Sequence, residues 1–215
     1  MIEKMKTVVQ CDFDGTVTEE DVSFMLLDAC ARGNWRQILK QYQDGKITVG
    51  RFNTEAFAMV KASKERLLEI AKSKVKIRPG FHKFVEACRV KGFRLVIVSN
   101  GLDCYIEEIL KDIGIKGVEV FAAQTEFKPD GLEVQYTGPD GVHLDAGFKD
   151  AYVDFFLKKG YRIIYIGNGT SDVLPAKQSH YIFATGDLLS KCKKTKVNCI
   201  PFTDFNEIVR ALESM

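Results

Sequence analysis

Two aspartates, Asp12 and Asp14, follow a short apolar run and stand two residues apart. The run over residues 7–11 predicts a buried strand, and side chains on a strand repeat every two residues. Both carboxylates therefore leave the backbone in the same direction, and Gly15 allows a sharp turn straight after them. Two like charges held this close repel, so the pair needs a cation or a shared proton. The pair points to chemistry that uses carboxylates together with a cation.

Further polar groups follow two other apolar runs, and one begins a predicted helix. They are Ser99 and Asn100 after residues 94–98, Asn168 and Asp172 after residues 161–166, and Lys149 at the start of a helix over residues 148–159. In parallel sheets ligands bind beyond the carboxyl ends of the strands, so we expect these groups to meet at one edge. Carboxylates, a hydroxyl, turn amides and an ammonium suit a phosphoryl group held with a hard cation.

The elements that must position these groups alternate between strand and helix. Such alternation predicts an α/β fold, Rossmann-like and three-layered, with a parallel sheet and right-handed crossovers. A small β-hairpin is expected around Pro129-Asp130-Gly131, which is a turn sequence. Pro79 is expected to open a helix. The predicted strands cover residues 7–11, 94–98, 118–122, 161–166, 181–184 and 199–202.

The block over residues 18–75 is different, because its apolar residues recur at helical spacing and it contains no convincing strand. Thr18 to Asp21 has the spacing of a helix-capping box. The block interrupts the strand–helix alternation, so we interpret it as an inserted helical cap domain. Residues 1–17 and 76–215 then form the catalytic core.

Charge and composition limit the classes of partner that the sequence predicts. The formal net charge is only +2, so no general surface for nucleic acid is implied, and the lysine-rich run 191–196 is interpreted as a solvated helix end. No stretch approaches about 18 consecutive apolar residues, and the chain enters a strand without a signal-like segment. The six cysteines form no C-x-x-C pair and are interpreted as free thiols. We expect a cytoplasmic protein without a membrane partner and leave a homodimer open.

The motifs in their order resemble the haloacid dehalogenase superfamily of phosphohydrolases. The resemblance rests on D-F-D-G-T-V-T at residues 12–18, the strand end at Ser99, Lys149, and G-N-G-T-S-D at residues 167–172, and it spans nearly the whole chain. The helical insertion is similar to the cap of the phosphoserine-phosphatase-like subgroup. Residues 18–21, residues 99–103 and the hairpin before Lys149 most resemble the phosphatases of methionine salvage.

This resemblance implies a phosphatase that hydrolyses a phosphomonoester of a small metabolite. Asp12 would be the nucleophile that forms an aspartyl-phosphate, and Asp14 would be the acid and base. Mg²⁺ would be held by Asp12, the backbone carbonyl of Asp14, Asn168 and Asp172. The further implied roles are phosphoryl contacts from Ser99 and the amide of Asn100, neutralisation by Lys149, shaping of the loop by Thr16, and substrate contacts from Thr16 and Asp21.

One residue departs from the family pattern. The fourth motif usually begins Gly-Asp, whereas this chain has Gly167-Asn168, and an amide oxygen brings no formal charge to the cation. Three alternatives to a metabolite phosphatase of the methionine-salvage type stay open. They are a phosphoserine phosphatase, a phosphotransferase, and a phosphate-binding sensor or scaffold without turnover; Asn168 favours the last.

Several candidate residues also have ordinary structural interpretations. Ser99 would serve as a helix N-cap, Lys149 would be an exposed helix lysine, and Asp172 would cap its short helix. Asp21 would stabilise the first turn of a helix, and Asn168 would be a turn residue.

Overall fold

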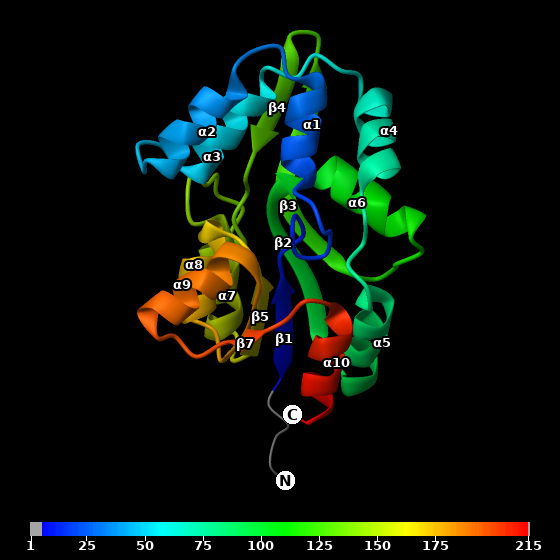
Figure 1. Cartoon of the computed structure of the whole chain (residues 1–215), viewed down its shortest axis with the longest axis vertical. Helices are drawn as coiled ribbons and strands as arrows, with labels where there is room; N and C mark the ends of the chain where they lie inside the picture. Colours follow the sequence, from blue (N-terminus) through cyan, green and yellow to red (C-terminus); the bar gives the residue numbers. More distant parts are fainter. Residues whose placement is uncertain (1–5, 215) are drawn as a thin grey trace.

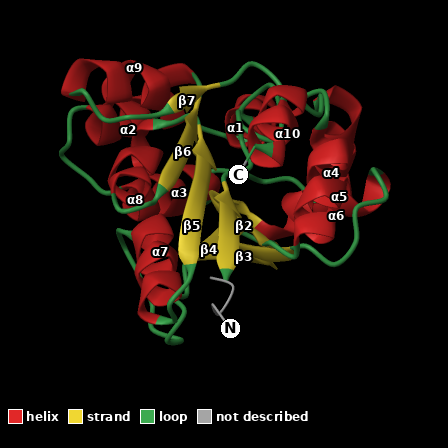
Figure 2. Ribbon diagram, turned by 90° about the horizontal axis from the view of Figure 1, so that it is seen from below, coloured by secondary structure: helices red, strands yellow, loops and turns green. Residues whose placement is uncertain are grey.

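The computed structural model describes residues 6–214, which form one mixed sheet with helices on both of its faces (Figures 1 and 2). Residues 1–5 and residue 215 lie outside the described residues. Residues 1–5 belong to the predicted core segment 1–17 and to the start of the chain, where no signal-like segment was expected. Over residues 6–214, the helices are all too short or too polar to span a membrane.

The sheet has the strand order β4-β3-β2-β1-β5-β6-β7, and every neighbouring pair is parallel except β3 with β4. Its strands are β1 (Thr7–Cys11), β2 (Arg94–Leu102), β3 (Glu119–Lys128), β4 (Gly131–Gln135), β5 (Arg162–Gly167), β6 (Tyr181–Ala184) and β7 (Ile200–Pro201). The α/β class, the parallel core sheet and the hairpin are therefore confirmed.

Strand β1 lies at the centre of this sheet, hydrogen-bonded to β2 on one side and β5 on the other. All five of its residues are buried, as expected for a parallel strand covered on both faces. Because β1 is central, the residues that follow it lie where the ends of β2 and β5 converge. This position brings the three predicted strand-end motifs to one edge.

Helices cover both faces of the sheet, and the two views place the same helices on each side (Figures 1 and 2). One side carries α5 (Phe81–Lys91), α6 (Asp103–Asp112) and α10 (Phe205–Glu213), and the other carries α7 (Phe148–Lys158), α8 (Val173–Lys177) and α9 (Gly186–Thr195). Three layers result.

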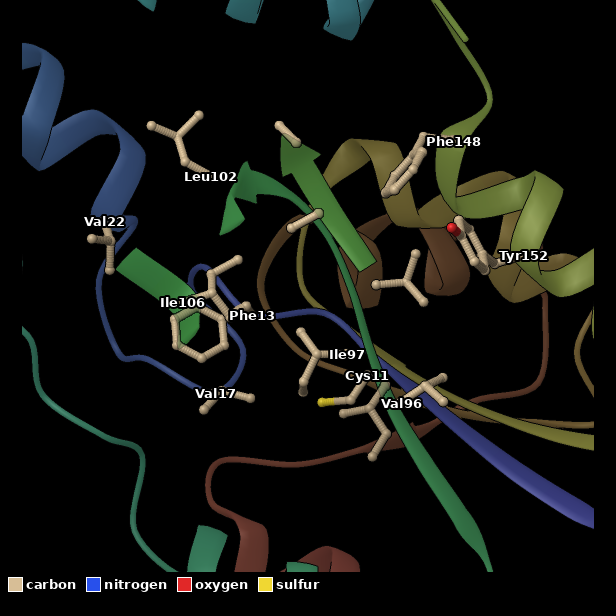
Figure 3. Close-up of a cluster of buried hydrophobic side chains, with 14 of the residues drawn as sticks. Cys11, Phe13, Val17, Val22, Val96, Ile97, Leu102, Ile106, Phe148 and Tyr152 are labelled. Carbon is tan, nitrogen blue, oxygen red and sulfur yellow. The ribbon is translucent and has the colours of Figure 1, made fainter. Parts of the chain in front are cut away.

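Apolar residues of the β1 end pack into the core between these layers (Figure 3). Cys11, Phe13 and Val17 are fully buried and lie with Ile97 and Ile106 in one cluster. The residues between them in sequence, Asp12 and Asp14, therefore face the other way. Burial of the apolar neighbours fixes the direction of both carboxylates.

Four helices lie beyond the carboxyl ends of the strands, at the top of Figure 1: α1 (Val22–Cys30), α2 (Trp35–Gln43), α3 (Val49–Phe57) and α4 (Lys64–Lys74). Helix α3 contacts β4, so the hairpin reaches into this helical block. The two connections to the core pair as a short antiparallel ribbon, with Thr18 opposite Ile77. The predicted boundaries after residue 17 and before residue 76 fall in this ribbon, and the division into two domains stays a prediction.

Several local expectations were wrong. Thr18 does not cap α1, since its hydroxyl bonds the carbonyls of Phe13 and Glu20, and Asp21 is the cap residue instead. Pro79 lies before the start of α5, whose cap residue is Gly80. Strand β2 continues through the predicted turn after residue 98, and β3 runs unbroken into the hairpin.

Candidate active site

A buried lysine joins two carboxylates at the centre of the site. The ammonium nitrogen of Lys149 lies 2.7 Å from Oδ1 of Asp12 and 2.7 Å from Oδ1 of Asp172. Lys149 sits in the first turn of α7 and is only 3% exposed. Its alternative interpretation as a solvent-exposed helix lysine is therefore wrong.

Charge around Lys149 is divided unequally between the two carboxylates. Burial, then the neighbouring charge of Asp172, raises the pKa of Asp12 to about 7, although Lys149 acts in the opposite direction. Burial also acts to raise the pKa of Asp172, but Lys149 and Tyr165 outweigh it and leave that pKa below its usual value. Lys149 therefore stabilises the charged form of both carboxylates, and burial leaves a raised pKa only at Asp12.

Asp172 is fully buried and has both oxygens saturated. Its Oδ1 accepts from Lys149 and from the Tyr165 hydroxyl, both at 2.7 Å. Its Oδ2 accepts from the backbone amides of Asn168 at 3.0 Å and Gly169 at 2.8 Å. The expectation of direct metal ligation by Asp172 does not fit this arrangement, because no oxygen faces the cavity. Asp172 instead fixes Lys149 and the loop that carries Asn168.

Asp14 is held by donors from two directions. The Tyr105 hydroxyl donates to its Oδ2 at 2.5 Å, the backbone amide of Val22 to its Oδ1 at 3.3 Å, and the Ser23 hydroxyl to Oδ2 at 3.4 Å. Burial, followed by the charge of Asp21, raises the pKa of Asp14 well above its usual value. A carboxyl in this environment can be kept protonated near neutral pH, as a general acid requires.

Asn168 lies against the loop that carries the two aspartates. Its Oδ1 accepts from the Thr16 hydroxyl at 3.0 Å. A Cβ built on Gly15 would stand 2.2 Å from Nδ2 of Asn168, and Gly15 has φ +71°, so glycine is needed here for both reasons. Thr16 is fully buried and bonds Asn168, so the structure makes it a support for the loop rather than a substrate contact.

Ser99 and Asn100 lie within β2, where the strand passes the site. The Ser99 hydroxyl accepts from the amide of Gly101 at 3.0 Å, and helix α6 begins only at Asp103, so Ser99 as a helix N-cap is wrong. The carbonyl of Asn100 accepts from the Asn53 side chain at 2.9 Å and from the Tyr136 hydroxyl at 2.6 Å. Helix α3 and the hairpin thus both hold this segment.

These groups open into a cavity of about 440 Å³ between the strand ends and the helical block. Its floor includes Asp12, Asp14, Ser99, Asn100, Lys149 and Asn168. Its opposite wall carries a group of apolar side chains, beside the polar residues Asp21, Ser23, Gln43 and Asn53. The apolar group is Phe24, Leu39, Tyr42, Val49 and Phe52. Of the predicted site residues, only Thr16 and Asp172 are absent from the lining.

Asp21 was considered from the sequence as a residue that stabilises the first turn of a helix and as a substrate contact. Its carboxylate accepts from the amide of Phe24 at 2.8 Å and so caps α1. It also lines the cavity, on the side of the helical block. The capping bond explains its structure, and a substrate contact stays a prediction.

The residues present fit Mg²⁺, although among residues 6–214 no group of three His, Cys, Asp or Glu side chains is arranged to hold a metal. The fitting set is mixed: a carboxylate from Asp12, the backbone carbonyl of Asp14, and the amide oxygen of Asn168. The Asp14 carbonyl accepts no hydrogen bond from the described part of the chain, so it is free to ligate. Mg²⁺ commonly takes few protein oxygens and completes its shell with water and substrate phosphate.

The sequence-based reasoning missed two residues that hold the site together. Tyr105 looks like one more core position of α6, and the signal was that a buried tyrosine hydroxyl needs a partner. Arg78, in the short ribbon that joins the helical block to the core, donates to the carbonyls of Gly15 and Thr16 at 2.8 Å each. No sequence pattern marks an arginine that binds backbone carbonyls.

Comparison with known proteins gives relatives along the whole chain. The 2-hydroxy-3-keto-5-methylthiopentenyl-1-phosphate phosphatase of Brevibacillus brevis is 26% identical over 214 residues, covering 98% of this chain and 96% of the relative. The enzyme of that name from an Exiguobacterium species is 27% identical over 208 residues, covering 95% and 96%. Pdp3-interacting factor 1 of Schizosaccharomyces pombe is 28% identical over 225 residues, covering 100% and 98%.

Solved structures with this fold include phosphoserine phosphatases. One, a phospho-aspartyl intermediate analogue, superposes with a TM-score of 0.72 at 18% identity, covering 97% of this chain and 99% of the other. The phosphoserine phosphatase of T. onnurineus has a TM-score of 0.71 at 18% identity, covering 100% and 98%. The family model for haloacid dehalogenase-like hydrolases matches residues 9–176. With its motifs gathered at one sheet edge, the chain belongs to the haloacid dehalogenase-like hydrolase family.

Proposed function

We propose that this hydrolase is a Mg²⁺-dependent phosphatase that cleaves a small phosphorylated metabolite through an aspartyl-phosphate on Asp12. The observation that carries the proposal is the ion pair between Lys149 and Asp12 on the floor of the cavity. Lys149 holds Oδ1 of Asp12 and so fixes the orientation of the carboxylate toward a bound phosphoryl group. A carboxylate fixed in this way is suited to nucleophilic attack.

The proposed reaction has two steps. In the first, Asp12 attacks phosphorus, the bond from phosphorus to the leaving oxygen breaks, and the Asp14 carboxyl gives its proton to that oxygen. In the second, Asp14 takes a proton from water, the water oxygen bonds phosphorus, and the carboxylate of Asp12 is released with inorganic phosphate. Ser99 and Asn100 line the cavity, and the Ser99 hydroxyl and the Asn100 amide would bind the phosphoryl oxygens.

Asp12, the Asp14 carbonyl and Asn168 would hold the cation, which would supply positive charge beside the phosphoryl oxygens. Lys149 is the only lysine or arginine lining the cavity in the described chain, and two carboxylates already compensate its charge. A phosphate dianion therefore needs further positive charge at this floor, which supports the proposed metal dependence.

The wall of the cavity favours a substrate with an uncharged, apolar end. Phosphoserine carries a carboxylate, and no second cation lines the cavity within residues 6–214. Arg51, an arginine of α3 in the helical block, is paired with Glu55 at 2.7 Å and does not line the cavity. The aromatic and aliphatic wall suits instead a thioether or similar chain, as in the substrate named for the methylthiopentenyl phosphatases.

A sensor without turnover is the second candidate, and the neutral Asn168 is the observation that favours it. The same chain geometry would bind phosphate but hold the cation more weakly. A phosphotransferase would share the intermediate on Asp12 and differ only in its acceptor.

A panel of phosphomonoesters tests the proposal. We expect Mg²⁺-dependent phosphate release, with esters that carry uncharged apolar chains preferred over phosphoserine by their kcat/KM values. Preference for phosphoserine would contradict the substrate class. Transfer to an added alcohol in place of water would identify a phosphotransferase, and binding without release from any ester would favour the sensor.

A further inference from the structure

The carboxyl group of Asp14 sits in a cradle of hydroxyl and amide donors that the family motifs do not include. The Tyr105 hydroxyl lies 2.5 Å from Oδ2 of Asp14 and 2.9 Å from the Ser23 hydroxyl oxygen. Ser23 and the amide of Val22 reach Asp14 from the start of α1, while Tyr105 reaches it from α6. Asp14 is therefore clamped between the helical block and the core.

The backbone next to this contact leaves room for it. A Cβ built on Gly101 would stand 2.0 Å from the Tyr105 hydroxyl oxygen and 2.3 Å from Oδ2 of Asp14. Any side chain at position 101 would therefore separate the hydroxyl from the carboxylate. Tyr105 itself is fully buried, with its ring 6.4 Å from that of Phe13, so it has no freedom to turn away. Packing holds the hydroxyl in place.

We propose that Tyr105 is a positioning residue that holds the Asp14 carboxyl in line with the leaving oxygen during proton transfer. This inference rests on the proposed function. As the bond between phosphorus and the leaving oxygen breaks, Asp14 gives up its proton and becomes a carboxylate. The hydrogen bond from Tyr105 then goes to a charged acceptor, which is stronger than one to a neutral acceptor. The hydrogen bond from Tyr105 to Asp14 therefore becomes stronger as Asp14 gives its proton to the leaving oxygen.

The leaving group offers a readout that a purely structural role would not move. Para-nitrophenolate is a stable anion and needs little protonation, whereas an alkoxide cannot leave without a proton. Loss of Asp14 positioning should therefore slow alkyl esters far more than para-nitrophenyl phosphate. The ratio kcat/KM reports this step, because it covers events up to departure of the alcohol.

The test compares kcat/KM for para-nitrophenyl, phenyl and butyl phosphate in the native chain and in Tyr105→Phe. We expect a loss of about 10- to 100-fold with butyl phosphate and of less than about 3-fold with para-nitrophenyl phosphate. Tyr152→Phe is the matched control, since it removes a buried hydroxyl whose bond, to the Thr137 carbonyl at 3.2 Å, lies outside the cavity. It should behave as the native chain does with all three esters.

Equal loss across the three esters, or no loss, would overturn the inference. If Tyr105→Phe fails to fold by thermal unfolding, Ser23→Ala decides by the same criterion, with a smaller loss expected because its bond to Asp14 is longer. If the native chain releases no phosphate from any of the esters, the proposed function itself fails, and the inference with it. These outcomes are distinguishable because only the last concerns the native chain.

Discussion

Lys149 and Asp12 form an ion pair of 2.7 Å in which both side chains are almost fully buried. Lys149 also pairs with Asp172, so one ammonium serves two carboxylates. The group of three carries one net negative charge when all are ionised, and burial makes that charge costly. The raised pKa of Asp12 and the need for a cation both follow from this imbalance.

Removing the ammonium should be strongly destabilising. Lys149→Met would leave Asp172 and Asp12 facing each other in the interior, and breaking a buried pair in this way costs about 3–5 kcal/mol. We expect the free energy of unfolding, measured by denaturant titration, to fall by about this amount, with loss of phosphate release. Lys158→Met on the same helix, at an exposed position, is the control and should change little. Comparable stability of both variants would contradict the role of the ion pair.

Two alanine variants can separate the effect of the close approach of Gly15 to Asn168 from the effect of backbone strain. Gly15 and Gly45 both have φ +71°, but a Cβ on Gly45 meets nothing within 4 Å. Alanine at either position should cost about 1 kcal/mol through the backbone conformation. Only Gly15→Ala should lose more than this, together with Mg²⁺ binding, because it displaces Asn168. Thermal unfolding and calorimetric Mg²⁺ titration measure the two effects, and equal losses in both variants would count against the contact.

Restoring the usual carboxylate should strengthen the cation site. In Asn168→Asp, Thr16 keeps an acceptor at the same place, and the cation gains one negative ligand. We expect the dissociation constant for Mg²⁺ to fall about 10-fold, or about 1.4 kcal/mol. Asn198→Asp, at an exposed position outside the cavity, should leave it unchanged. Weaker binding in Asn168→Asp would mean that the amide has a role of its own.

Mg²⁺ binding should depend on pH through Asp12. Burial raises the pKa of Asp12 to about 7, so below pH 7 the metal-free protein carries a proton there. Because the cation needs the ionised carboxylate, affinity should fall as the pH drops below 7, and binding should release a proton. Calorimetry at pH 6.5 and pH 8 in buffers of different ionisation enthalpy measures the release. The same affinity at both values, without proton release, would show that Asp12 is not a ligand.

The strand ends were predictable because apolar runs and turn residues mark them directly. Asp12, Asp14, Lys149 and Asn168 meet as expected, since parallel strands bring their carboxyl ends to one edge and β1 lies between β2 and β5. Alternation along β1 also turns Cys11 to the opposite face, into the apolar core. The sequence predicted the order of the motifs along the chain, and the parallel sheet brings those motifs close together in space.

The contacts that were not predicted depend on the direction of individual side chains, which spacing along the sequence does not determine. Asp172 was expected to be a ligand of the cation, but its two carboxylate oxygens already accept four hydrogen bonds. Thr18 was expected to cap α1, but Asp21 caps it, because the Thr18 hydroxyl instead bonds backbone carbonyls within the loop that carries the two aspartates. Tyr105 and Arg78 act through contacts with residues far away in sequence, so helical periodicity could show only that Tyr105 is buried.

The most direct test of the central claim is phosphate release by the native chain and by Asp12→Asn, each with Mg²⁺ and with EDTA. Asparagine fills the same space but cannot act as the nucleophile, so the matched pair isolates the chemistry. We predict release from para-nitrophenyl phosphate only in the native chain with Mg²⁺. Release by Asp12→Asn at the native rate, or by the native chain in EDTA, would contradict a metal-dependent mechanism through Asp12.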